Sequence, residues 1–206
     1  MNEIQPIIII ATWSSGSTAL AGYLDRCGAH TCPPHQATTD PKTPNAFEPY
    51  AYANALRRLF NEANLAEKGE FEDFERFFEI FWKEECDKAR ERGLHHIVLK
   101  HPLQTFILSY LHQRLQPKYL FLTRPTAEIE RTRMRRQWAS VYGAYGAKNI
   151  YSHAMSFLIE NSCKYLPVPY NLIIDDKLFR SEVLHFCGLT PDEHMLKSGE
   201  KWLINR

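Results

Sequence analysis

The stretch IIIIATWSSGSTAL, residues 7–20, decides how this chain folds. Four isoleucines in succession, with no polar alternation, predict a strand that is covered on both faces, as in the middle of a parallel sheet. A polar run rich in small residues follows, and residues 18–27 then carry apolar side chains at helical spacing up to Gly28, which is a helix stop signal. We therefore expect strand, loop and helix in that order.

Outward from this stretch, apolar runs alternate with helical patterns. Residues 96–100 (HIVLK), 118–123 (KYLFLT) and 170–174 (YNLII) predict further strands. Helices are expected over the phenylalanine-rich region 49–93 and over residues 103–115, 126–138, 151–164 and 179–187, whereas Pro191 opens a tail and segment 31–44 should be an irregular loop. This alternation predicts an α/β three-layer sandwich, with a central parallel sheet flanked by helices, as a single domain over residues 1–206.

The composition excludes several classes of protein. Of 206 residues, 44% are hydrophobic and 24% charged, as in globular proteins, and the formal net charge is only +1. The apolar run 7–11 is shorter than the roughly 20 residues of a membrane span, and no signal-peptide pattern precedes it. The five cysteines show neither a CxxC pair nor metal-ligand spacing, which indicates reduced thiols and no metal. We expect a cytoplasmic protein without a membrane partner.

The loop after the first strand has the residues of an anion site. Ser15, Gly16, Ser17 and Thr18 would offer hydroxyls and backbone N–H groups at a helix N-terminus, an arrangement that binds phosphate. A serine-rich turn that caps an ordinary helix is the structural alternative. Against the triphosphate loop GxxxxGK[ST], Ser17 occupies the lysine position. The missing lysine disfavours a small P-loop kinase.

In order and spacing these residues resemble the sulfotransferase family, whose loop [KR]SGT[ST] binds the 5′-phosphosulfate of 3′-phosphoadenosine 5′-phosphosulfate (PAPS). That loop reads SSGST over residues 14–18. The family's second signature, a strand-end arginine with a hydroxyl residue eight positions later, matches Arg124 and Thr132. Segments 45–48 (NAFE) and 98–103 (VLKHPL) are similar to further family landmarks. The resemblance implies a P-loop NTPase-like fold and co-substrate contacts from Thr12, Ser14, Ser15, Gly16, Ser17, Thr18, Arg124 and Thr132.

For catalysis, the resemblance points to the strand end that carries Lys100 and His101. His101 is the first candidate for the general base, because imidazole can accept a hydroxyl proton near neutral pH, and Glu48 is the second. A histidine satisfied by a backbone carbonyl and a solvated loop glutamate are the structural alternatives. Ser14 stands where the family carries a basic residue that contacts the transferred group. Lys100 or an arginine of the run 131–136 is expected to replace that charge.

The sequence thus predicts a metal-free sulfotransferase that moves a sulfuryl group from PAPS to a hydroxyl or amine of a small-molecule or glycan acceptor. A catalytically silent module that binds PAPS or its product, 3′-phosphoadenosine 5′-phosphate (PAP), is the alternative, because Ser14 replaces the basic residue. A nucleic-acid partner is not expected, since the basic run RTRMRR lacks interleaved aromatic residues and the net charge is near zero.

Overall fold

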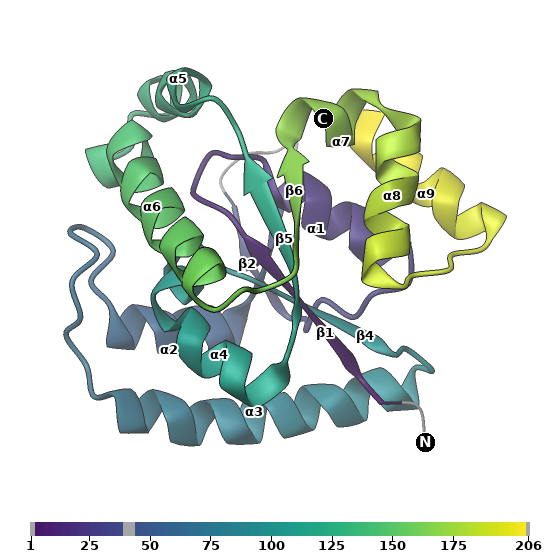
Figure 1. The fold of residues 1–206 in the computed structure, drawn as a ribbon, viewed down its shortest axis with the longest axis horizontal. Coiled ribbons are helices and arrows are strands. Elements are labelled where there is room, and N and C mark those ends of the chain that lie inside the picture. Colours follow the sequence, from purple (N-terminus) through teal and green to yellow (C-terminus); the bar gives the residue numbers. More distant parts are fainter. Residues whose placement is uncertain (1–2, 39–43, 205–206) are drawn as a thin grey trace.

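The computed structural model describes residues 3–38 and 44–204. Its centre is a parallel sheet of β1 (Gln5–Ile10), β4 (His96–Lys100), β5 (Lys118–Thr123) and β6 (Tyr165–Pro169), in the order β4-β1-β5-β6 (Figure 1). A short antiparallel pair, β2 (His35–Ala37) and β3 (Asn45–Pro49), lies beside it. The predicted α/β fold with a central parallel sheet is confirmed.

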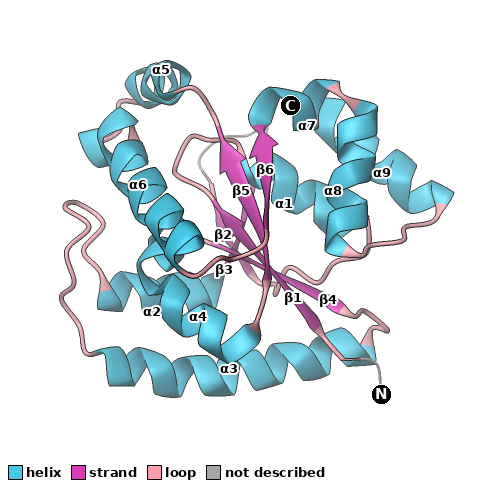
Figure 2. Cartoon of the chain, in the orientation of Figure 1, coloured by secondary structure: helices cyan, strands magenta, loops and turns pink. Residues whose placement is uncertain are grey.

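Helices cover both faces of the sheet (Figure 2). One face carries α1 (Ser17–Arg26), α7 (Tyr170–Asp175), α8 (Lys177–Cys187) and α9 (Glu193–Ile204). The other carries α2 (Tyr50–Leu59), α3 (Phe71–Glu91), α4 (Leu108–Leu115) and α6 (Ala144–Glu160). The remaining helix, α5 (Thr126–Arg136), packs against α6 beyond the end of β5. Within the described ranges, no helix combines the length and the apolar character that crossing a membrane requires. The cytoplasmic location stays a prediction.

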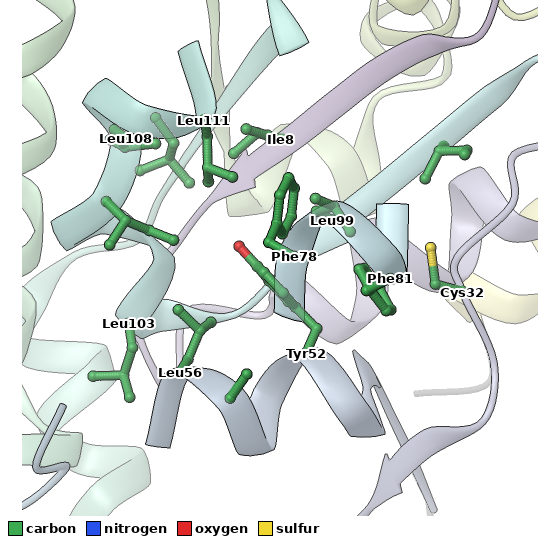
Figure 3. Packing of buried hydrophobic residues seen from close by; sticks show 14 of the residues in the cluster. Ile8, Cys32, Tyr52, Leu56, Phe78, Phe81, Leu99, Leu103, Leu108 and Leu111 are labelled. Carbon is green, nitrogen blue, oxygen red and sulfur yellow. The ribbon is translucent and has the colours of Figure 1, made fainter. Parts of the chain in front are cut away.

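The isoleucines of β1 explain the three layers. Ile7 and Ile9 belong to the core under α1 and α8, whereas Ile8 and Ile10 belong to the core under α2 and α3, and all are fully buried. Figure 3 shows this second core, where Tyr52 and Leu56 of α2 and Phe78 and Phe81 of α3 converge on the sheet. Each large side chain buried in this way contributes about 1.5–3 kcal/mol to stability. The alternation along β1 therefore holds helices on both sides.

The last strand differs from its prediction. Residues 170–174 form helix α7 instead of a strand, and the strand β6 precedes them as Tyr165–Pro169. Pro167 and Pro169 argue against a central strand because proline cannot donate to the ladder, but β6 lies at the sheet edge, where proline is tolerated. Pro169 then occupies the N-cap of α7. The apolar run after it therefore continues as a helix.

Other boundaries differ as well. The region 49–93 contains two helices separated by the loop 60–70, and the helix expected over 151–164 already begins at Ala144. Residues 102–107 form a 3₁₀ turn before α4, and the predicted tail after Pro191 is mostly helix α9. The loop expected over 31–44 contains strand β2, and its residues 39–43 lie outside the described part of the chain. All five cysteines are free thiols, as expected.

Candidate functional site

The loop between β1 and α1 is a tight turn that only certain residues can form. Ser14 and Gly16 have positive φ values of 61° and 93°, and the Ser15 hydroxyl donates to the Thr12 carbonyl at 2.6 Å. A Cβ at Gly16 would overlap the ring of Tyr170, so glycine is required there for space as well as for conformation. Gly16 is also the N-cap of α1. No side chain caps this end of α1, and an uncapped helix N-terminus is an arrangement that can bind an anion.

Arg124 lies directly against this loop. Because β1 and β5 are parallel neighbours, their carboxyl ends reach the same edge of the sheet, which is where α/β folds bind ligands. The Arg124 Nη1 donates to the Ser14 carbonyl at 3.0 Å, and its guanidinium lies 4.6 Å from the centre of the Tyr170 ring. Its Nε donates to Glu128, whose carbonyl accepts from the Thr132 hydroxyl. The structure therefore places Arg124 against the loop, whereas Thr132 contacts Glu128 within α5.

Lys100 supplies a buried positive charge next to the loop. Only 2% of this residue is exposed. Its Nζ donates to the Ala46 carbonyl at 2.7 Å and to Glu48 Oε1 at 2.9 Å, and reaches the Thr18 hydroxyl at 3.5 Å. Burial alone would raise the pKa of Glu48, but Lys100, together with His101 and Arg57, lowers it below its usual value. Glu48 is therefore an ionised counter-charge for Lys100.

His101 is fully buried and neutral. Burial disfavours the imidazolium and lowers the pKa of His101 to about 4. Glu48 acts to raise this pKa, whereas the nearby cations Arg57 and Lys100 lower it further. The Leu103 N–H donates to His101 Nδ1 at 3.2 Å. This hydrogen bond assigns the ring proton of the neutral form to Nε2. Nε2 has no hydrogen-bond partner among the described residues.

Several residues of the site carry no sequence signal. Glu62, in the loop after α2, places Oε1 4.0 Å from His101 Nε2 and accepts a 3.0 Å hydrogen bond from Arg57. The Tyr142 hydroxyl reaches Glu62 Oε2 at 3.5 Å. The Tyr142 ring packs edge-on against Trp13 of the loop, 5.0 Å between centres, and its carbonyl accepts from the Ser14 hydroxyl. Tyr142 thus connects Glu62 to the phosphate loop.

The comparisons with known proteins bear on this arrangement. No protein-family model and no curated protein matches the sequence. The structure does match the solved "Sulfotransferase Domain from the Synechococcus PCC 7002 Olefin Synthase", with a TM-score of 0.57 and 17% identity, over 96% of this chain and 78% of that one. The fold is sulfotransferase-like. At this identity the match establishes the shared architecture, and the chemistry has to be argued from the residues.

Within this sulfotransferase-like fold, the two expected replacements for the missing basic residue at position 14 differ in their contacts. Lys100 reaches Thr18 in the first turn of α1. In the arginine run 131–136, Arg133 is held by Glu130 and by the Trp138 carbonyl, and the Arg136 guanidinium lies over the Trp138 ring. Of these two expected replacements, Lys100 contacts the junction between the loop and α1, and Arg124 lies against the same loop.

A second polar cluster lies elsewhere in the fold. His30, Cys32 and Glu85 are buried, and their ligand atoms lie within 4.8 Å of one another. Glu85 accepts from His30 at 2.7 Å and from Lys88 at 2.6 Å, and Arg92 donates to His30 Nδ1 at 3.1 Å. Because two cations already donate into this cluster, its hydrogen bonds are satisfied without a metal ion, and we interpret it as a structural network.

Proposed function

We propose that this chain is a sulfotransferase that transfers a sulfuryl group from PAPS to a hydroxyl or amine of a small-molecule or glycan acceptor. The observation that carries the proposal is the hydrogen bond from Arg124 to the Ser14 carbonyl, which joins the strand-end arginine to the phosphate loop. A nucleotide with phosphates on its 5′ and 3′ positions needs two anion sites at one edge of the sheet. The sulfotransferase-like fold and the edge of the sheet where the loop lies support the same assignment.

The two ends of PAPS would use different groups. Residues 15–18 present backbone N–H groups and hydroxyls to the 5′-phosphosulfate at the N-terminus of α1. Arg124 and Thr132 lie on either side of Glu128 and would hold the 3′-phosphate. Arg124 now pairs with Glu128, which is 42% exposed, and a phosphate with two negative charges is a stronger partner for a guanidinium.

Lys100 completes the proposed donor site. Sulfuryl transfer places negative charge on the leaving phosphate oxygen, and a fixed cation stabilises that charge best where water is excluded. Lys100 is buried and already lies 3.5 Å from the Thr18 hydroxyl. In this proposal it takes the role of the basic residue that Ser14 replaces, and the transfer requires no metal.

Binding of PAP to purified protein, measured by titration calorimetry, tests the donor site. We expect wild type to bind PAP and Arg124→Ala to lose at least about tenfold in affinity, since a hydrogen bond to a charged group contributes about 1.5–3 kcal/mol. Arg90→Ala is the matched control, because Arg90 is an exposed arginine of α3, which contributes no residue to the proposed site. It should bind PAP like wild type. Absence of PAP binding, or equal binding by Arg124→Ala, would refute the proposal.

A catalytically silent PAP-binding module is the second candidate. Ser14 is not basic, and its hydroxyl is directed to the Tyr142 carbonyl at 3.4 Å instead of toward a leaving group. Transfer from ³⁵S-labelled PAPS to a panel of phenols, alcohols and amines separates the two functions. If the chain is a sulfotransferase, the wild-type protein transfers the label to an acceptor. If it is a silent module, the wild-type protein binds PAP without transferring label, and only Ser14→Lys gains transfer.

A further inference from the structure

Two carboxylates flank the unpartnered face of His101. Its Nε2 lies 3.8 Å from Glu48 Oε2 and 4.0 Å from Glu62 Oε1, too far for a direct hydrogen bond to either. An oxygen about 2.8 Å from each of two atoms at this separation can contact both of them. A hydroxyl placed there would accept the Nε2 hydrogen of His101 and donate its own hydrogen to a carboxylate. Because His101 Nε2 is buried, an acceptor hydroxyl would reach it as the side chain of Glu62, which is 23% exposed, moves aside.

His101 itself does not accept the proton in this geometry. Its Nδ1 lone pair is used by the Leu103 N–H, and its Nε2 carries the hydrogen of the neutral ring. To act as a base, the ring would have to give up its cap on the following 3₁₀ turn. The fixed tautomer makes His101 a donor toward the acceptor oxygen.

Glu48 is unsuited to accept the proton from the acceptor hydroxyl for a different reason. Its Oε1 neutralises Lys100, and the side chains of this pair are only 12% and 3% exposed. A proton on Glu48 would leave the Lys100 ammonium buried without its counter-charge, which costs several kcal/mol. Proton transfer to Glu48 would thus raise the barrier that a base has to lower.

Glu62 has no such constraint. Its partner Arg57 has a side chain that is 33% exposed, and Arg57 also lies 3.9 Å from Glu48, so this cation keeps both water and a second carboxylate when Glu62 is protonated. Through Tyr142, Glu62 is one residue away from Trp13 and Ser14 of the phosphate loop. It is therefore linked through one side chain to the loop that would hold the donor's sulfuryl group.

We propose that Glu62 is the general base of the transfer and that His101 orients the acceptor oxygen through its Nε2 hydrogen. This inference rests on the proposed function. In the step, Glu62 takes the proton from the acceptor hydroxyl, and an oxygen lone pair forms the new bond to sulfur. The bond between sulfur and the bridging oxygen breaks, and its electron pair leaves with the 5′-phosphate of PAP. The products are the sulfated acceptor, PAP and protonated Glu62.

The test compares Glu62→Gln with wild type, first in PAP binding and then in ³⁵S transfer from PAPS to phenols, alcohols and amines. PAP release without an acceptor reports water as the nucleophile. Glutamine keeps one oxygen that accepts from Arg57 and offers an amide N–H to the Tyr142 hydroxyl oxygen, but it cannot take a proton. We expect PAP affinity within about twofold of wild type, kcat lower by about 10²- to 10⁴-fold, and partial recovery in Glu62→Asp. Glu67→Gln, an exposed glutamate of the same loop, is the control and should match wild type.

The outcomes separate this inference from the function on which it rests. If wild type does not bind PAP, the proposed function fails and the inference fails with it. If wild type transfers sulfate and Glu62→Gln does so at the same kcat, the base assignment is wrong while the function stands. If wild type binds PAP but transfers sulfate neither to any acceptor of the panel nor to water, the base assignment is also overturned. The silent module is then the remaining function.

Discussion

Lys100 is the residue on which the charge balance of the site depends. It is a cation on a buried strand end, and Glu48 and the Ala46 carbonyl hold it where water cannot solvate it. A buried pair of this kind is costly to assemble and more costly to break, because removal of one partner leaves the other charge alone. The same pair keeps Glu48 ionised as a counter-charge for Lys100. Of the two glutamates near His101, Glu48 and Glu62, only Glu62 is then proposed as a base.

The Lys100–Glu48 pair can be tested by unfolding. Lys100→Met should lower the free energy of unfolding by about 3–5 kcal/mol, and Lys100→Met combined with Glu48→Gln should recover most of that loss. Urea denaturation followed by circular dichroism measures both values. Lys83→Met replaces an exposed lysine of α3 and should change stability by less than about 0.5 kcal/mol. If Lys100→Met is as stable as Lys83→Met, the Lys100–Glu48 pair does not contribute to the free energy of unfolding.

His101 makes stability depend on pH. Its pKa is about 4 in the folded chain, against an ordinary value of 6.5. Between these values the unfolded chain binds a proton that the folded chain excludes, so stability falls as the pH drops from 6.5 toward 4. The lowered pKa of Glu48 acts in the same direction when the pH falls through the ordinary glutamate range.

The variant His101→Asn isolates this effect. Asparagine can still accept from the Leu103 N–H as a helix cap, but it does not titrate. Between pH 7 and pH 4.5, wild type should lose roughly 2–3 kcal/mol more stability than the variant, measured by urea denaturation at both pH values. His35 and His96, whose pKa values are also lowered by burial, are present in both proteins and cancel in the comparison. Equal losses in the two proteins would exclude His101 as the source.

At the scale of elements, α1 is held at both of its ends. Its N-terminus begins at Gly16 under the ring of Tyr170, the first residue of α7. Trp202 of α9 donates to the Ala19 carbonyl in the first turn at 3.1 Å, and its ring centre lies 3.9 Å from the guanidinium of Arg26, the last residue of α1. The C-terminal helices therefore hold α1 against the sheet.

The close contact at Gly16 gives a prediction for this element. Gly16→Ala should destabilise the fold by about 1–3 kcal/mol, because φ is 93° and the new methyl group meets Tyr170. PAP affinity should fall with it, since the loop has to shift. Adding Tyr170→Ala removes the overlap but not the backbone strain, so recovery should be partial. Thermal melting and calorimetry of both variants measure this, and full recovery would show that φ imposes no constraint.

At the scale of the whole molecule, the prediction succeeded where a local pattern carries the information. The isoleucines of β1 indicated a doubly covered strand, which the structure confirms. Arg124 lies against the loop, whereas the anion site expected from Arg124 and Thr132 stays a prediction. Glu62 escaped notice because its loop has no period and its neighbours, His101 and Tyr142, are far away in sequence. The last strand was predicted at the wrong residues, because two prolines within the five residues of β6 argue against a strand when the sequence is read alone. Only tertiary context supplies these assignments.

The prolines of β6 also determine how this sheet meets other molecules. Pro167 and Pro169 are two positions apart, so their ring nitrogens point to the same side of the strand, and pairing with β5 leaves that side as the outer edge of the sheet. A strand from another chain would find no N–H groups at these two positions. The β6 edge of the sheet is thereby protected from edge-to-edge growth into aggregates.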